Sequence, residues 1–226
     1  MQELQLSDLL PAAVGIALSP LPIAAVILML FSARATSNGI SFVAGWFAGL
    51  LVVGGAILLL GGTSAGTSSE PSQASLIIQL LLGLLLLAAA FKQWRGFRAP
   101  SDEPAMPTWM RTIDDFSAAK AFGIAALLSG VNPKNLALNA AGVLVIAQAG
   151  LSSTQEWTAL LVFVVLSSLT VALPVLYYFV GGEKAKAKLD TMKIWLMANN
   201  GAVMAVLFLV FGVKLVGAGA QGLIAP

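Results

Sequence analysis

The chain has 226 residues, of which 58% are hydrophobic and only 10% are charged, and its mean hydropathy is +0.92. Soluble domains contain roughly 45–50% apolar and about 25% charged residues, so this composition predicts a protein surrounded by lipid. A net charge of +2 does not favour nucleic acid as a partner. The sequence has no cysteine and no histidine, which excludes disulfide exchange, thiolate metal sites and imidazole proton relays.

Six apolar segments are each long enough to cross about 30 Å of hydrocarbon as a helix. Their expected ranges are 7–31, 38–61, 74–97, 119–149, 156–180 and 194–217. Residues 98–117 combine three prolines with charges of both signs, which indicates a cytoplasmic linker. The sequence therefore predicts an all-α polytopic membrane protein with six transmembrane helices, three in residues 1–97 and three in residues 118–226.

The basic residues predict the orientation, because cytoplasmic loops are enriched in lysine and arginine. They fall in the first, third and fifth loops: Arg34, then five residues from Lys92 to Lys120, then four lysines from Lys184 to Lys193. We therefore expect these loops to be cytoplasmic and both termini to lie outside, in a multi-pass protein of the plasma membrane.

Two segments contain similar polar interruptions. The first includes GIALSPLPIAAVIL (15–28) and the fourth includes GIAALLSGVNPKNLAL (123–138). Ser19-Pro20 and Asn132-Pro133 each resemble a helix N-cap followed by proline at the first helical position. Because three spans per half give the halves opposite directions, we expect two inverted three-helix repeats in which helices 1 and 4 are broken near mid-membrane. The alternative is a pair of proline kinks whose freed carbonyls bind nearby serine or asparagine.

Lys134 follows the second interruption directly. A cation at the bilayer centre costs roughly 2.5–3.5 kcal/mol on insertion scales, so it should face a cavity or a partner. No Asp or Glu lies deep in any span. The N-termini of two restarted helices would add free N–H groups and positive dipole ends, which favour an anion. Lys134 is therefore the expected anion contact. The alternative is a structural ammonium that caps the carbonyls of residues 128–131.

The asparagines of the fourth segment, Asn132, Asn135 and Asn139, share one face of the restarted helix. They either line a substrate path or form hydrogen bonds between helices, and the sequence leaves both open. GWFAG (45–49) is a small-xxx-small pattern that predicts close helix packing. The expected substrate-binding residues, with Ser19 and Asn132 as caps, are Ser19, Pro20, Pro22, Asn132, Pro133, Lys134, Asn135 and Asn139.

The sequence contains no catalytic constellation, nucleotide-binding loop or cluster of acidic metal ligands in its spans. We therefore expect neither an enzyme nor a resident metal or cofactor. If the protein moves a substrate, the driving energy comes from an ion gradient, a partner pump or the substrate gradient.

The six-span layout, with LSPLPIAAVILML (18–30) and GVNPKNLALNAAG (130–142), resembles the GAP family of actinobacterial membrane proteins. This family is also called the sulfolipid-1-addressing protein family and belongs to the LysE transporter superfamily. The resemblance covers essentially the whole chain. It implies a role in moving glycolipids, such as glycopeptidolipids or sulfolipids, across the plasma membrane of mycobacteria and their relatives.

Together these features predict an exporter or translocator of an anionic or polar glycolipid. One alternative is a LysE-like exporter of a small anionic solute such as an amino acid. The other is a non-transporting scaffold in the bilayer that escorts a lipid synthase or a pump. A homodimer is compatible with the superfamily, although no sequence feature fixes the oligomeric state.

Overall fold

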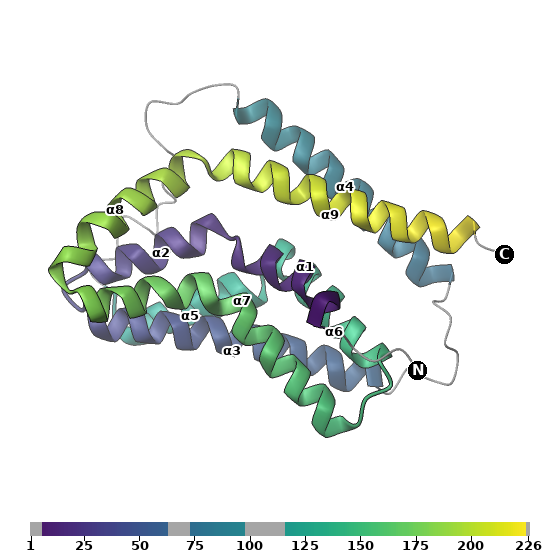
Figure 1. The fold of residues 1–226 in the computed structure, drawn as a ribbon, viewed down its shortest axis with the longest axis horizontal. Coiled ribbons are helices and arrows are strands. Elements are labelled where there is room, and N and C mark those ends of the chain that lie inside the picture. Colours follow the sequence, from purple (N-terminus) through teal and green to yellow (C-terminus); the bar gives the residue numbers. More distant parts are fainter. Residues whose placement is uncertain (1–5, 63–72, 98–115, 225–226) are drawn as a thin grey trace. The chain divides into compact units, whose positions relative to one another are not determined.

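The computed structural model describes residues 6–62, 73–97 and 116–224, and every regular element in these ranges is an α-helix (Figure 1). The all-α class is therefore confirmed. The helices are α1 (Leu6–Ala17), α2 (Pro20–Phe31), α3 (Ala35–Gly62), α4 (Gln73–Phe97), α5 (Ala118–Gly130), α6 (Pro133–Gln148), α7 (Ser153–Gly181), α8 (Glu183–Ala198) and α9 (Asn200–Ile224).

The described residues form nine helices, whereas six were expected, and the difference has two causes. The first and fourth predicted segments are each divided into two helices, α1–α2 and α5–α6, at the predicted proline sites. Residues 183–198, most of which were expected in a loop, form α8 instead. The predicted sixth segment, 194–217, was therefore wrong at its start, since α8 ends at Ala198 and α9 begins at Asn200.

The helices form two compact units. The first unit contains α1, α2, α3, α5, α6, α7 and α8, and the second contains α4 and α9. The linker predicted at 98–117 lies outside the described residues except for Phe116 and Ser117, which precede α5.

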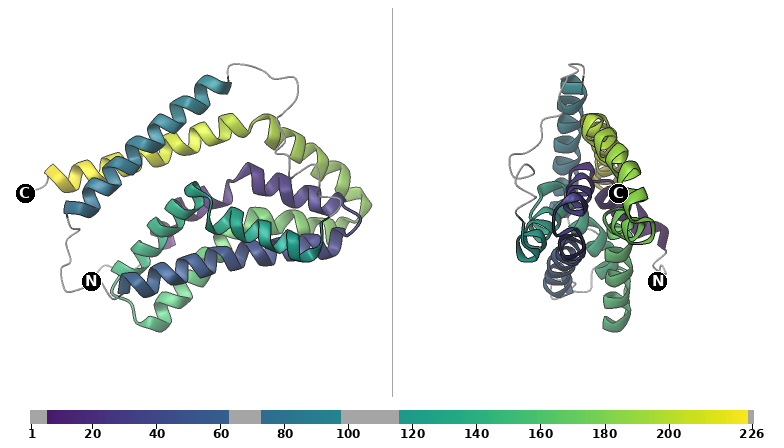
Figure 2. Two further views of the ribbon diagram at one scale, coloured as in Figure 1. Left: turned by 180° about the vertical axis from the view of Figure 1, so that it is seen from behind. Right: turned by 90° about the vertical axis from the view of Figure 1, so that its left-hand side faces the viewer.

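In the first unit the halves of the broken pairs pack against the long helices α3 and α7. α1 packs against α6 and α7, while α3 packs against α5, α6 and α7 (Figure 2). α2 packs against α3 and α7, and nine of its twelve residues are buried. A helix that is apolar on every side is stable only when it is surrounded, so α2 belongs at the centre of this unit.

Glycine allows α3 and α5 to touch through their backbones. A Cβ atom on Gly45 would lie 2.1 Å from the Phe122 carbonyl oxygen, and one on Gly49 would lie 2.5 Å from that of Ala126. The close packing predicted from the GWFAG pattern is therefore confirmed. In the second unit, α4 and α9 approach each other in the same way at Gly83 and Gly219.

Several helices are long and apolar enough to cross a bilayer. Among the described residues, α3, α7 and α9 meet this requirement singly, and α1 and α2 meet it together as a pair bent by 48°. α5 and α6 are shorter apolar helices. These lengths fit a membrane protein with three or four spans, before α5 and α6 are considered together.

Candidate functional site

Both predicted breaks are present, and local sequence explains them. α1 ends at Ala17 and α2 restarts at Pro20, while α5 ends at Gly130 and α6 restarts at Pro133. A residue that precedes proline is driven out of the helical region by a clash with the proline ring. Ser19 and Asn132 accordingly have extended backbones, with ψ of 95° and 123°. Each proline then takes the first helical position, where it loses no hydrogen bond.

Lys134 connects the second break to the first. Its Nζ lies 2.9 Å from the Gly15 carbonyl oxygen and 2.7 Å from Ser19 Oγ, with the Leu18 carbonyl oxygen at 3.5 Å. The last carbonyls of a helix lack partners within that helix. The ammonium therefore caps the end of α1. The alternative that placed it on the carbonyls of residues 128–131 is wrong, because the side chain reaches across to the other broken helix.

Asn135, rather than Lys134, caps a carbonyl at the end of α5. Its Nδ2 donates to the Leu128 carbonyl oxygen at 2.9 Å, and its side chain is almost fully buried. Its Oδ1 lies 3.4 Å from Ser19 Oγ. Ser19 Oγ also lies 2.6 Å from the Ile16 carbonyl oxygen. A hydroxyl carries one hydrogen, and the shorter distance assigns it to Ile16.

Only one of the two predicted caps forms through its side chain. Asn132 Oδ1 accepts a hydrogen bond from the Lys134 backbone N–H at 3.0 Å, so the prediction for Asn132 is confirmed. Ser19 occupies the N-cap position of α2 but makes no side-chain cap. The cap predicted for Ser19 is wrong, because its hydroxyl donates back to α1 and accepts from Lys134 instead.

Thr170 of α7 completes the end of α1, and sequence analysis did not identify it. Its Oγ1 donates to the Ala17 carbonyl oxygen, which also accepts the Ser19 backbone N–H at 2.8 Å. The carbonyls of residues 14–18 therefore all have donors. Such complete pairing is what irregular backbone within a membrane requires. We call the cluster of Ser19, Lys134, Asn135 and Thr170 at the end of α1 the break junction.

Replacing Thr170 with valine should lower the free energy of unfolding by about 0.5–1.5 kcal/mol. The side chain keeps its shape but loses one hydrogen bond, and such bonds contribute roughly this amount in membranes. Thermal unfolding in detergent measures the change. Thr158→Val is the control, because Thr158 is exposed and bonds only a carbonyl of its own helix. Equal losses in the two variants would show that Thr170 does not hold the break.

The restarted helices offer fewer free donors than expected. Pro20, Pro22 and Pro133 have no N–H to donate. Some of the N–H groups that follow them already have acceptors. Ile23 N–H donates to the Ser19 carbonyl oxygen, and Leu136 N–H donates to the Asn132 carbonyl oxygen. In the described part of the chain, this leaves the N–H groups of Leu21 and Asn135 without a protein acceptor. Each half-helix thus has one free donor beside its positive dipole end.

The break junction carries a positive charge, and no acidic side chain in the described ranges pairs with it. The only described ion pair joins Lys193 to Asp190, far along the chain on α8. No group of three metal-ligating side chains occurs among the described residues. The ammonium and the two free N–H groups suit the binding of an anion by charge and hydrogen bonding.

Asn139 lies apart from these contacts. It is fully buried, and its Nδ2 donates to the Leu50 carbonyl oxygen of α3 at 3.0 Å. Of the two roles that the sequence left open, the observed contact is a hydrogen bond between helices. Its Oδ1 has no partner in the structure. Among the other predicted residues, Pro20 and Pro22 are buried at the start of α2 and Pro133 is exposed.

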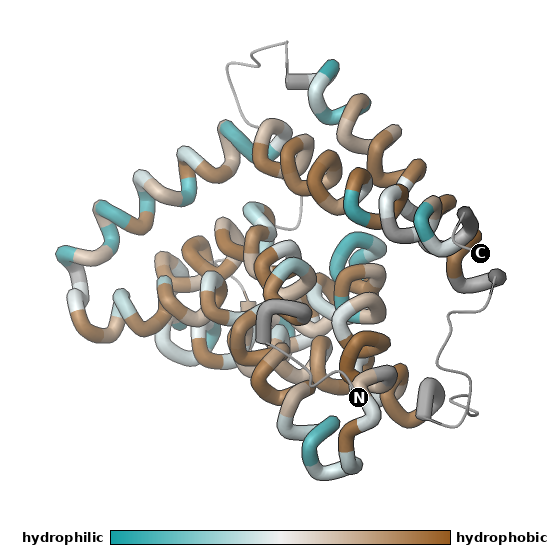
Figure 3. The backbone as a smooth tube through the Cα atoms, turned by 45° about the vertical axis from the view of Figure 1, so that its right-hand side comes forward, coloured by the Kyte–Doolittle hydropathy of each residue, from teal (hydrophilic) through white to brown (hydrophobic). Residues whose placement is uncertain are grey.

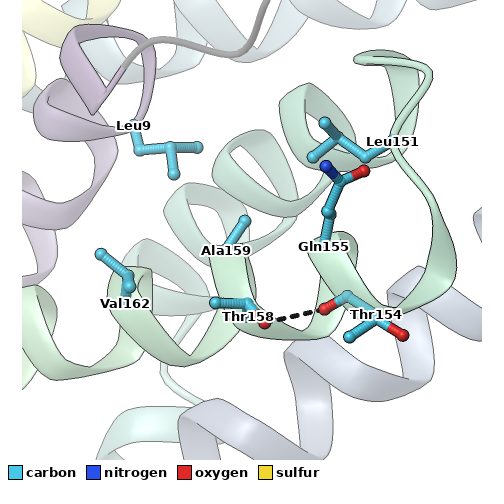
Figure 4. Close-up of a pocket in the computed structure, with 7 residues that line it drawn as sticks. All are labelled: Leu9, Leu151, Thr154, Gln155, Thr158, Ala159 and Val162. Atoms are coloured by element: carbon cyan, nitrogen blue, oxygen red, sulfur yellow. Dashed lines mark hydrogen bonds between the residues drawn. The ribbon is translucent and has the colours of Figure 1, made fainter.

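A groove of about 360 Å³ lies elsewhere in the first unit, and none of the predicted residues lines it. Its walls come from the start of α1 and the first turns of α7, where Leu9 faces Thr158 and Val162 (Figure 4). Thr158 Oγ1 donates a hydrogen bond to the Thr154 carbonyl oxygen at 2.8 Å. The groove contains no charged side chain.

A comparison with known protein families gives a match that spans nearly the whole chain. Residues 9–221 match the family described as Sap, sulfolipid-1-addressing protein. No curated protein and no solved structure matches the chain. The matched range includes both breaks and helices of both units.

Proposed function

Because the chain belongs to the sulfolipid-1-addressing protein family, we propose that it acts in lipid export and moves an anionic or polar glycolipid across the plasma membrane. The proposed path passes through the break junction. The arrangement of spans, the position of the basic residues and the unpaired charge of Lys134 each support this proposal.

Six spans follow if each broken pair crosses the membrane once. The spans are then α1–α2, α3, α4, α5–α6, α7 and α9, and each half begins with its broken pair. The packing supports an inverted repeat in which α1, α2 and α3 correspond to α5, α6 and α7. α3 packs on α5 and α6, and α7 packs on the corresponding helices, α1 and α2. Broken helices at the interface of inverted repeats form the substrate sites of many secondary transporters.

Basic residues at one end of the first unit support an orientation with this end in the cytoplasm. Asn38 Nδ2 lies 3.0 Å from the Phe116 carbonyl oxygen, which brings the starts of α3 and α5 together. Lys193 lies over the Phe31 ring at 5.2 Å, which places α8 beside the end of α2. Arg34 and Lys120 are exposed at this same end. Cytoplasmic enrichment of such residues is the general rule in membrane proteins.

The observation that carries the proposal is the position of Lys134 Nζ between the two broken helices, bonded to α1 and without an acidic partner among the described residues. A sulfate, phosphate or carboxylate headgroup would supply the missing negative charge. Binding such a group draws the ammonium away from Gly15 and Ser19 and leaves the end of α1 with fewer contacts to α6. Substrate binding is thereby coupled to movement of one repeat against the other.

A second candidate function is a non-transporting scaffold that escorts a lipid synthase or pump. One observation favours it: Lys134 already has two close protein acceptors, as a purely structural ammonium would. A scaffold needs the hydrogen bonds at the break but no anion at Nζ.

Translocation in proteoliposomes tests the proposal. Fluorescent sulfated and neutral glycolipids are placed in one leaflet, and their appearance in the other is measured for wild type, Lys134→Met and Lys120→Met. We expect wild type and Lys120→Met to move the sulfated lipid, and Lys134→Met to be slower by about tenfold or more, since a hydrogen bond to a charged group contributes roughly 1.5–3 kcal/mol.

Other outcomes select the alternatives. No transfer of any lipid by the wild type favours the scaffold. Export of a preloaded amino acid without lipid transfer favours the LysE-like solute exporter. Equal lipid transfer by wild type and Lys134→Met would contradict the path through the break junction.

A further inference from the structure

α8 combines basic side chains with exposed apolar ones. Lys184 and Lys188 are exposed one helical turn apart, and Ile194 and Trp195 follow near the helix end with 55% and 57% of their surfaces exposed. Lys184, Lys188 and Trp195 fall on the same side of the helix by its 3.6-residue period. Ala185 and Leu189, about a quarter to a third of a turn further round the helix, are buried, with 0% and 3% of their surfaces exposed.

The end of a long apolar helix positions α8. α7, at 29 residues, is one of the helices able to cross a bilayer, and α8 begins two residues after it ends. The turn passes through Gly182, whose φ of +53° favours glycine. Lys186 lies over the Tyr178 ring at 6.0 Å, which holds α8 near the end of α7. If α7 spans the membrane, α8 starts at the membrane surface.

Lysines outnumber acidic residues on α8 by four to two, with Glu183 and Asp190 as the acidic residues. Asp190 pairs with Lys193. Arg34 and Lys120 add positive charge to the same end of the first unit. Figure 3 shows hydrophilic residues recurring along α8, in contrast to the long hydrophobic stretches of the spanning helices. A basic helix with apolar anchors beside a span is the pattern that binds anionic membrane surfaces.

We propose that α8 is an interfacial helix that binds anionic phospholipid headgroups in the leaflet where α7 ends. Lys184 and Lys188 contact the headgroup phosphates, and Ile194 and Trp195 insert at the level of the first acyl carbons. This interaction concerns lipids of the surrounding bilayer rather than a transported lipid, so it is independent of the proposed export function.

Native mass spectrometry of the purified full chain, titrated with phosphatidylglycerol or phosphatidylcholine, tests the proposal. The wild type should retain phosphatidylglycerol preferentially. The double variant Lys184→Gln/Lys188→Gln should bind it about tenfold more weakly or worse, since each lysine near an anionic surface contributes a factor of roughly five. Binding of phosphatidylcholine should not change.

The control is Arg34→Gln/Lys120→Gln, which removes the same charge from the same end but leaves α8 intact. It should lose less affinity than the α8 double variant, since these residues lie off the helix. Equal losses in the two double variants, or no preference of the wild type for phosphatidylglycerol, would overturn the proposal. Unchanged melting points of both double variants in phosphatidylcholine establish that they remain folded.

Discussion

Alanine at Gly45 or Gly49 should destabilise the protein more than other single substitutions of small residues, by about 2–4 kcal/mol in the free energy of unfolding. The added Cβ atoms would lie 2.1 Å from the Phe122 carbonyl oxygen and 2.5 Å from the Ala126 carbonyl oxygen. Overpacking typically costs roughly 1–3 kcal/mol when side chains can rotate away. Backbone oxygens of α5 cannot rotate, so α3 and α5 must separate and lose contact along their length.

Gly123→Ala is the matched control for these variants. Gly123 lies on α5, and a Cβ atom there would meet nothing within 4 Å. Alanine at a helix position is favoured over glycine by about 1 kcal/mol, so this variant should be as stable as wild type or more so. Thermal unfolding of all three variants in the same detergent gives the comparison. If Gly45→Ala melts at the same temperature as Gly123→Ala, the backbones of α3 and α5 are not in the close contact described here.

Features of the fold that depend on neighbouring residues were predictable from sequence. Both breaks followed from a polar residue before proline, which acts within one turn of the chain. The close approach of α3 followed from two glycines four residues apart. The cap by Asn132 was predictable for the same reason, since it involves an N–H only two residues away.

Contacts between distant segments were not predictable. Lys134 and the Gly15 carbonyl oxygen are separated by 119 positions, so only the folded chain shows which break the ammonium caps. Thr170 bonds a carbonyl 153 positions away and gave a weak signal, because it is one of several serine and threonine residues in an apolar segment. Ser19 failed as a side-chain cap because its hydroxyl donates to the Ile16 carbonyl oxygen and accepts a hydrogen bond from Lys134.

α8 was missed for a different reason. Segments were located by hydropathy, and a lysine-rich stretch between two apolar segments resembles a loop on that measure. Lysine and alanine are nevertheless good helix formers, and they dominate the first half of α8. Helix propensity and burial of Ala185 and Leu189 therefore produced a helix that hydropathy could not detect.

Lys134→Met should reduce the stabilisation of the protein by anionic ligands to about half or less. A ligand that binds only the native state raises its stability by about 2.7 kcal/mol at one hundred times its Kd. The methionine keeps the apolar stem but removes the charge and the bonds to Gly15 and Ser19. A loss of about tenfold or more in affinity follows from the usual contribution of a charged hydrogen bond.

Two further variants distinguish the effect of losing the Lys134 charge from the effect of loosening the break junction. Lys134→Arg retains the positive charge beside α1 and should retain part of the ligand response. Thr170→Val weakens the same break without altering charge, so it should melt lower than wild type but show the full ligand response. A response lost in both Lys134→Met and Thr170→Val would indicate general disruption rather than an anion site.

The most direct measurement is therefore the melting point of the purified protein across sulfated and phosphorylated glycolipids, their neutral counterparts and amino acids, for wild type and Lys134→Met. An anionic glycolipid should raise the melting point of the wild type, and its neutral counterpart should do so less. Lys134→Met should respond no more strongly to the anionic glycolipid than to the neutral one. Identical responses of wild type and Lys134→Met to every ligand would contradict the proposed anion site and leave Lys134 as a structural cap of α1.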